Sequence, residues 1–390
     1  MLKKFSDFVG SKNTSDFPID LEAYSYASSE VELKPFMVLW PESVDQVRRI
    51  MLYANQSRTP ITIRGSGTSL VDSTLGENSV ILSSERMNKI LKIDVSNKMV
   101  EVEAGVRISD LNRGLAAFKM AFPISPVNPV ATIGGMIALN LVSKESHSLG
   151  RMEKWVEEIE FVDGTGKHFY TSKKAAAVGK EGLSGFITKA KLRIAEQQML
   201  SFDIFNAEQL SELLKKVRQL ENDLDVYFLE FFDKKFSEIF GFFNSYCLVA
   251  AYASLKGKNR ILPESSAILK KVESAHSSAR LKGYYYLQDA SLSLEKSYDL
   301  IQWCEKNNVA LQGHIGLGFF YAYFLKEDEG LVLNFRSFVK SLGGQSGKLF
   351  GHGVKNAGLI GSEEKKLLVK LKDEYDYNNI INAGKLINYR

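Results

Sequence analysis

The sequence has few cysteines that could cross-link the chain and no long apolar run that could anchor it in a membrane. It contains only two cysteines, Cys247 and Cys304, which are far apart and belong to no CxxC or Cys/His cluster. Neither a disulfide framework nor a zinc site is therefore indicated. The longest apolar stretch, near residues 246–255, is much shorter than the roughly 20 residues that span a bilayer. The basic N-terminus also lacks the apolar region of a secretory signal. These absences favour a reduced, cytoplasmic compartment, with peripheral membrane contact left open.

The sequence also has no block of one charge sign. Its 50 lysines and arginines are scattered among 46 acidic residues, which leaves a net charge of +4. We therefore expect no nucleic-acid partner, whereas an anionic cofactor or substrate is compatible with the small positive excess. With 45% hydrophobic residues in 390, the composition is that of a globular protein of two or three domains.

The pattern of apolar residues changes twice along the chain and predicts a division at residues 1–197, 198–345 and 346–390. In the first part, short strands and turns alternate with a few helices, and apolar spacing predicts a helix that starts after Ser43. In the second part, strands alternate with helices, among them one over 264–277, which predicts an α+β domain with an antiparallel sheet. The last part contains a charged helix over 362–375 and a tail expected to pack on an earlier domain.

A glycine turn follows the predicted strand at residues 60–63. Its sequence is Arg64-Gly65-Ser66-Gly67-Thr68-Ser69-Leu70. Glycines permit positive φ and a close approach of the backbone, so consecutive N–H groups can converge on an anion such as a pyrophosphate. A leucine stands where a GxGxxG motif needs its third glycine, and no GxxxxGK[ST] motif occurs, so neither a Rossmann site nor a P-loop is indicated. A plain tight turn between strands remains the alternative.

Two further glycine clusters follow. Three prolines within residues 123–129 set an extended path that leads to Thr132-Ile133-Gly134-Gly135. There the backbone is expected to lie flat against a planar group or another backbone. The segment Gly179–Thr188 is another glycine-rich cluster of the same kind.

In this order, the three segments resemble the FAD-binding domain of the vanillyl-alcohol-oxidase/PCMH flavoproteins, in the branch of the D-lactate dehydrogenase and glycolate oxidase flavin subunits. Those relatives carry RGxGTSL, TIGGN and GSEGTLGIIT motifs, which correspond here to residues 64–70, 132–136 and 179–188. Later segments are similar to the family's GHxGDGNxH, EHGIG and NPGK motifs, at residues 313–321, 351–354 and 382–385. The resemblance covers about residues 35–385.

The resemblance implies an α+β fold with a two-subdomain PCMH-type FAD-binding domain and a cap domain with a ferredoxin-like antiparallel sheet. It implies FAD as the cofactor, held non-covalently because the turn lacks the histidine of covalent relatives. The turn would wrap the pyrophosphate, Pro126 and the glycine pair would border the ribityl chain and flavin ring, and the remaining residues would contact the cofactor elsewhere. The implied cofactor-binding residues are Arg64, Gly65, Ser66, Gly67, Thr68, Ser69, Leu70, Pro126, Thr132, Gly134, Gly135, Gly182, Ile187 and Asn382.

The sequence departs from the family at its metal ligands. His314 is present, but the second histidine of the motif is replaced by Tyr321 and the glutamate by Gly351. One imidazole does not make a metal site, so no metal is expected. His352 and His314 are the candidate catalytic residues, because imidazole suits the removal of a hydroxyl proton. Either could instead be a hydrogen-bonded core or surface histidine.

The predicted function is an FAD-dependent oxidoreductase that oxidises a 2-hydroxy acid similar to D-lactate or glycolate, by hydride transfer to flavin N5. Its expected partners are a small-molecule substrate and an electron acceptor, which could be a quinone, a cytochrome or a partner subunit. Two alternatives stay open: an FAD-binding electron-transfer subunit without substrate chemistry of its own, and a sugar or polyol oxidase.

Overall fold

The computed structural model describes residues 2–27, 31–241, 245–253, 270, 273–274, 279, 281–347, 349–354 and 356–389. The chain divides into two compact units. Unit 1 comprises Met1–Leu141, Arg151–Gln197 and Phe350–Arg390, and unit 2 comprises Val142–Gly150 and Gln198–Leu349. Most of the helix predicted over 264–277 lies outside the described residues.

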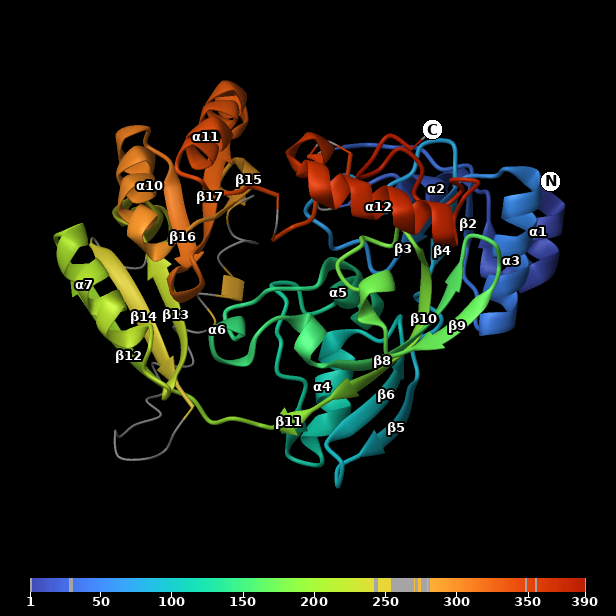
Figure 1. Ribbon diagram of the computed structural model, residues 1–390, viewed down its shortest axis with the longest axis horizontal. Coiled ribbons are helices and arrows are strands. Elements are labelled where there is room, and N and C mark those ends of the chain that lie inside the picture. Colours follow the sequence, from blue (N-terminus) through green and yellow to red (C-terminus); the bar gives the residue numbers. More distant parts are fainter. Residues whose placement is uncertain are drawn as a thin grey trace. The chain divides into compact units, whose positions relative to one another are not determined.

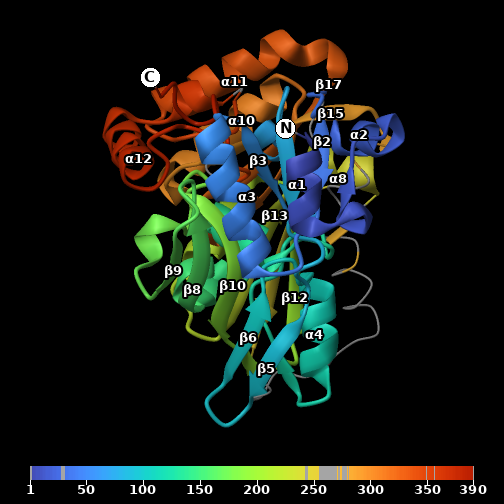
Figure 2. The ribbon, with the colours of Figure 1, turned by 90° about the vertical axis from the view of Figure 1, so that its right-hand side faces the viewer.

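The first part of unit 1 is a small sheet covered by helices. Among the described residues, its strand order is β1-β2-β4-β3, and β4 pairs in parallel with both β2 and β3. The strands are β1 (Thr14–Ser15), β2 (Met37–Leu39), β3 (Ile61–Arg64) and β4 (Val80–Ser83), and the helices are α1 (Leu2–Val9), α2 (Pro18–Tyr24) and α3 (Val44–Ser57). In Figure 2, α1 and α3 lie side by side.

The start of α3 confirms the predicted cap. The Ser43 hydroxyl accepts the Gln46 N–H at 3.3 Å, which satisfies one of the free donors of the first turn. The helix ends at Arg58 in a left-handed conformation. Its apolar stripe, which includes Val47, Ile50 and Met51, is fully buried and packs on the sheet that positions the glycine turn.

The second part of unit 1 is an antiparallel sheet with strand order β5-β6-β10-β8-β9 among the described residues. The strands are β5 (Ile90–Asp94), β6 (Met99–Glu103), β8 (Val156–Asp163), β9 (His168–Thr171) and β10 (Gly185–Arg193), and a short pair joins β7 (Met120–Ala121) to β11 (Ala195–Glu196). Helices α4 (Ile108–Ala116) and α5 (Ile133–Leu139) accompany it.

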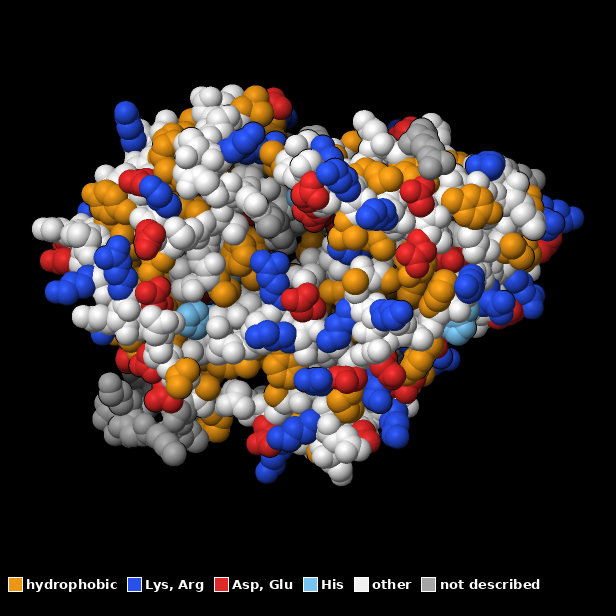
Figure 3. Space-filling view, in the orientation of Figure 1, with side chains coloured by type: hydrophobic (Ala, Val, Ile, Leu, Met, Phe, Trp, Pro, Cys, Tyr) orange, Lys and Arg blue, Asp and Glu red, His pale blue; other side chains and the backbone are white. Residues whose placement is uncertain are grey.

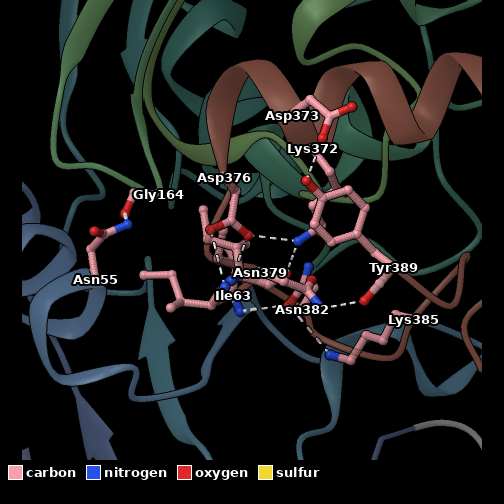
Figure 4. A network of polar contacts seen from close by, with 12 residues as sticks. Asn55, Ile63, Gly164, Lys372, Asp373, Asp376, Asn379, Asn382, Lys385 and Tyr389 are labelled. Carbon is pink, nitrogen blue, oxygen red and sulfur yellow. Dashed lines mark hydrogen bonds and ion pairs between the residues drawn. The ribbon is translucent and has the colours of Figure 1, made fainter.

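The C-terminal segment completes unit 1. After α12 (Ser362–Tyr375), the chain lies beside β3: the Ile61 N–H donates to the Ile380 carbonyl at 2.7 Å, and the Asn382 N–H donates to the Ile61 carbonyl at 2.8 Å. Figure 4 shows Lys372 against Asp376, an ion pair of 2.6 Å that is almost completely buried. This buried ion pair lies at the C-terminal end of α12, just before the residues that run beside β3.

Unit 2 is built on an antiparallel sheet with strand order β12-β14-β13-β16-β17-β15 among the described residues. The strands are β12 (Ser201–Ala207), β13 (Val226–Phe232), β14 (Tyr246–Tyr252), β15 (Tyr284–Ser291), β16 (Ala310–His314) and β17 (Phe319–Leu325). Figure 1 shows α7 (Leu210–Leu220), α10 (Leu294–Lys306) and α11 (Glu329–Ser341) on one face of the sheet, where the largest apolar core lies. The helix α8 (Lys234–Phe240) packs against β14 and β16.

One segment belongs to a different unit than the sequence pattern predicted. Residues 142–150, with α6 (Ser146–Leu149), were expected in the first domain but are part of unit 2. The reason is packing, because α6 contacts β13 and the short helix at Ile315–Leu317. There the His147 ring lies so close to Gly316 that a Cβ on this glycine would be 2.7 Å from Nδ1.

The surface carries both charge signs. Lysine and arginine side chains are interspersed with acidic ones over the face in view (Figure 3). Within the described residues, no helix is both long and apolar enough to cross a membrane.

Candidate functional site

The glycine turn leaves β3 with a run of free donors. Residues 65–70 are all half-buried, and none of their backbone N–H groups donates a hydrogen bond to any residue that the structure describes. Gly67 has a positive φ of 70°, which lets the chain reverse here without the strain that a side chain would cause. A run of half-buried donors without protein partners is the arrangement that binds an anion.

Arg64 supports the turn through contacts within the protein. Its guanidinium donates to the carbonyls of Tyr26 at 2.9 Å and Tyr24 at 3.4 Å, and it lies 5.0 Å from the Tyr24 ring centroid. Burial lowers the pKa of this guanidinium. A Cβ on Gly67 would come within 2.3 Å of the Arg64 Nη2 atom, so a side chain here would also displace the Arg64 guanidinium.

The second glycine segment borders the first. A Cβ on Gly65 would meet the Thr132 hydroxyl at 2.3 Å, and this hydroxyl caps α5 by accepting the Gly135 N–H at 3.4 Å. The glycine pair is helical rather than flat. The missing side chain of Gly134 faces Ala104, whose carbonyl accepts the Gly134 N–H at 2.8 Å. Gly134 is thus explained by close backbone packing, whereas Gly135 is exposed.

Asn382 joins the turn to the third glycine segment. Its Oδ1 accepts the Ile63 N–H at 3.1 Å, and its Nδ2 donates to the Glu181 carbonyl at 3.0 Å. Gly182, with φ of 73°, lies so close that a Cβ would be 3.1 Å from the same Nδ2. The structure therefore brings residues 63–70, 132, 182 and 382 together. Of the remaining predicted residues, Ile187 is buried in β10 and Pro126 is half-buried in the loop before α5.

This assembly fits a dinucleotide with paired phosphates. Besides the free N–H groups, the hydroxyls of Ser66, Thr74 and Ser184 are buried without a hydrogen-bond partner among the described residues. A buried hydroxyl without a partner is costly. Of the three, Ser66 belongs to the turn, where a bound anion would satisfy its hydroxyl. The turn residues would hold the phosphates of FAD by backbone donors, and Ser66 is the side chain placed to add another.

His352 lies in a loop of unit 1 that two carboxylates hold by its backbone. Glu181 accepts the N–H groups of His352 at 2.7 Å and Gly353 at 3.1 Å, and Asp72 accepts that of Val354 at 2.7 Å. The His352 Nδ1 atom lies 3.3 Å from Glu181 Oε1, whereas Nε2 makes no hydrogen bond to any described residue. Sequence reasoning missed Glu181 and Asp72, although Glu181 stands inside the third glycine segment.

A buried lysine completes this region. The Lys385 Nζ donates to the Ser73 carbonyl at 2.7 Å and approaches Asn382 Oδ1 at 3.4 Å; the two side chains are neighbours in Figure 4. Burial lowers the pKa of Lys385 to about 7, although the nearby charges of Asp72 and Glu181 oppose this shift. The lysine was visible in the sequence as the last residue of the NPGK-like motif, but its burial was not.

His314 has a different environment, in unit 2. Its Nδ1 contacts the fully buried Glu230, and its Nε2 contacts the Tyr321 hydroxyl at 2.7 Å. Burial raises the pKa of Tyr321 well above its usual range, so the hydroxyl is neutral and can donate to or accept from the ring. Both ring nitrogens therefore have protein partners.

Two of the family's three metal-ligand positions carry residues of another kind here, Tyr321 and Gly351. Within the described residues, no group of three or more His, Cys, Asp or Glu side chains is arranged to hold a metal ion. Lys144 forms ion pairs with Glu145 at 3.0 Å and Glu273 at 3.4 Å. Burial alone would lower the pKa of Lys144, but the carboxylates of Glu145 and Glu273 raise it above its usual range.

Comparison with known proteins agrees with this geometry. Residues 35–172 match the sequence model of a family described as FAD binding domain. D-lactate dehydrogenase of Archaeoglobus fulgidus is 30% identical over 174 residues, which cover 42% of this chain and 39% of that protein. Glycolate oxidase subunit GlcD of Bacillus subtilis is 30% identical over 199 residues, which cover 47% and 42%. A solved structure of alkyldihydroxyacetonephosphate synthase has a TM-score of 0.74 at 14% identity, covering 97% of this chain and 83% of that one.

Residues 35–172 are therefore an FAD binding domain, and FAD is confirmed as the predicted cofactor. The resemblance to the FAD-linked oxidases that include D-lactate dehydrogenases and a glycolate oxidase subunit is confirmed. So is the α+β fold with a PCMH-type FAD-binding domain. The matched residues span 39% and 42% of these two relatives, less than half of either.

Proposed function

We propose that this chain binds FAD non-covalently and oxidises a 2-hydroxy acid of the D-lactate or glycolate type. The observation that carries the proposal is the run of N–H groups at residues 65–70 that have no partner in the described part of the chain, together with the buried hydroxyl of Ser66. It lies in the domain that matches the FAD-binding family, and the similar proteins include D-lactate dehydrogenases and a glycolate oxidase subunit. Bound FAD supplies the acceptor for the hydride that such an oxidation releases.

The non-covalent linkage is supported by the side chains of the turn. Between Gly65 and Leu70 the turn has only glycine, serine, threonine and leucine, and none of these offers the nitrogen or sulfur nucleophile that attacks a flavin.

Of the two predicted catalytic histidines, His352 is better suited to remove the substrate's hydroxyl proton. A general base needs a lone pair within hydrogen-bond reach of that proton. His352 has Nε2 without a partner among the described residues, whereas both nitrogens of His314 are engaged. His314 therefore serves mainly to order the sheet of unit 2.

The cofactor and the substrate class are tested separately. Purified protein should be yellow or take up added FAD, and acid precipitation should release the flavin into the supernatant. A yellow pellet would contradict the non-covalent linkage, and a folded colourless protein that binds no FAD would end the proposal. D-lactate, glycolate and D-2-hydroxyglutarate should then be tested for anaerobic bleaching of the bound flavin, with a polyol set in parallel.

A second candidate is an FAD-binding electron-transfer subunit without substrate chemistry of its own. The engaged ring of His314 and the glycine at position 351 favour it, because both remove polar groups that the family places near its metal. A flavin that no hydroxy acid or polyol reduces, but that dithionite reduces reversibly, is the outcome expected for this candidate.

A further inference from the structure

We propose that Glu181 is a positioning residue that holds His352 with its proton on Nδ1 and keeps Nε2 available to the substrate. The role of this pair in substrate oxidation rests on the function proposed above, whereas the contact between the two side chains does not. The carboxylate and the ring are 171 residues apart in sequence and meet inside unit 1.

The backbone of Glu181 is held by hydrogen bonds through both its N–H and its carbonyl group. Its own N–H donates to the Ala138 carbonyl at 2.8 Å, and its carbonyl accepts from Asn382 at 3.0 Å. The residue adopts a left-handed conformation, with φ of 47°, which is uncommon for a side chain other than glycine, asparagine or aspartate. Such strain persists only where the surroundings impose it, and it gathers at functional sites.

The loop that contains Gly351 leaves space for the Glu181 carboxylate. A Cβ on Gly351 would lie 2.9 Å from the Glu181 Cδ atom, so any side chain at this position would push the carboxylate away from His352. Gly351 also has a positive φ of 87°. The glycine that replaces the family's glutamate is therefore what allows Glu181 to reach the backbone and the ring of His352.

The contact between Glu181 and the His352 ring indicates which ring nitrogen carries the proton of a neutral imidazole. An ionised carboxylate only accepts hydrogen bonds, and Glu181 Oε1 lies 3.3 Å from Nδ1. With Glu181 as the acceptor, Nδ1 is the donor, and a neutral ring in this tautomer has its lone pair on Nε2. A carboxylate that orients imidazole in this way is the second member of Ser-His-Asp triads. In the proton transfer, the substrate O–H bond breaks, an Nε2–H bond forms, and the electron pair remains on the substrate oxygen.

Asp72 provides a matched control within the same loop. It accepts the Val354 N–H at 2.7 Å, and a Cβ on Gly353 would come within 1.9 Å of its Oδ1. It therefore holds the loop as Glu181 does, but no hydrogen bond among the described residues joins it to the imidazole. Asp72→Asn and Glu181→Gln each remove one negative charge beside Lys385, and only the second changes the partner of the ring.

The test is the tautomer of His352 in FAD-loaded protein labelled with ¹⁵N-histidine. Long-range ¹H–¹⁵N spectra distinguish a protonated ring nitrogen from one with a free lone pair, and His352→Asn identifies the signals among the five histidines. We expect protonated Nδ1 in the wild type and in Asp72→Asn, and a shift toward the Nε2-protonated form in Glu181→Gln. Thermal unfolding and flavin content report whether each variant is folded.

Two results would overturn the proposal: an Nε2-protonated ring in the wild type, or the same tautomer in Glu181→Gln as in the wild type. If a hydroxy acid reduces the flavin, Glu181→Gln should also slow that reduction by about 10- to 100-fold, in line with loss of part of a general-base contribution. If no hydroxy acid does so, the proposed function fails, whereas the tautomer still decides whether Glu181 orients the ring.

Discussion

The two histidines that the motifs single out lie in opposite kinds of environment. In unit 1, His352 has one ring nitrogen beside Glu181 and another without a partner among the described residues. In unit 2, His314 is held between Glu230 and Tyr321 by both nitrogens. A histidine that must accept a proton needs an open nitrogen, whereas one that is hydrogen-bonded on both sides orders a core. Under the function proposed above, this contrast favours His352 of unit 1 for the proton transfer and a structural role for His314 of unit 2.

The largest effect is expected in the glycine turn. Gly67→Val should abolish FAD binding, because a valine there would need a positive φ and its Cβ would lie 2.3 Å from the Arg64 Nη2 atom. The measurement is flavin content after purification and titration with FAD. Gly343→Val in unit 2 is the matched control. Gly343 has φ of 79°, and no described atom lies within 4 Å of the position that a Cβ would take, so this variant should lose some stability but keep full flavin content. Full FAD content in Gly67→Val would remove the turn from the site.

The next effect separates the histidines directly. His352→Asn should slow reduction of the flavin by a hydroxy acid by about 10²- to 10⁴-fold, the usual contribution of a general base. His314→Asn should leave most of this rate but lower stability, because Glu230 would lose a buried partner. Anaerobic stopped-flow absorbance measures both rates. Equal losses of rate in the two variants would refute the contrast between the units.

Lys385, one of two buried lysines among the described residues of unit 1, should give stability a pH dependence. The pKa of Lys385 is lowered to about 7 from the usual 10.5, so between these values the unfolded chain binds more protons than the folded one. Stability should therefore rise as the pH increases from about 7 toward 10.5. Lys385→Met should flatten this rise in urea unfolding curves, and the exposed Lys370→Met should not. An unchanged slope in Lys385→Met would show that the lysine is not the source of this pH dependence.

The smallest effect concerns unit 2. Tyr321→Phe leaves the Nε2 of His314 without its 2.7 Å partner, and a buried polar group without a hydrogen-bond partner costs about 1–3 kcal/mol. Urea unfolding should show this loss while flavin content stays complete. Tyr285→Phe, on an exposed tyrosine of β15, should change the free energy of unfolding by much less. A loss of flavin in Tyr321→Phe would tie His314 to the cofactor after all.

Much of unit 1 could be predicted because its signals are local. The cap at Ser43, the helix at 362–375 and the turn at 64–70 each depend on neighbouring residues. The strand β13 was not predicted. All seven of its residues, Val226–Phe232, are buried, so it lacks the alternation by which a half-exposed strand is recognised. The segment 142–150 was assigned to the wrong unit for a related reason, since only its packing against β13 and its neighbours shows where it belongs.

The sequence by itself determined where backbone must come close to something: glycines at 65, 67 and 182 mark those places because a residue without a side chain permits close approach and positive φ at least cost. Only the tertiary structure decided what each glycine meets. It placed Gly134 against Ala104 and Gly351 against Glu181. It also brought Glu181 next to His352, which is 171 residues away in the sequence. The physical reason is that conformational freedom is a property of one residue, whereas the direction of a carboxylate or an imidazole is set by partners that the fold brings together.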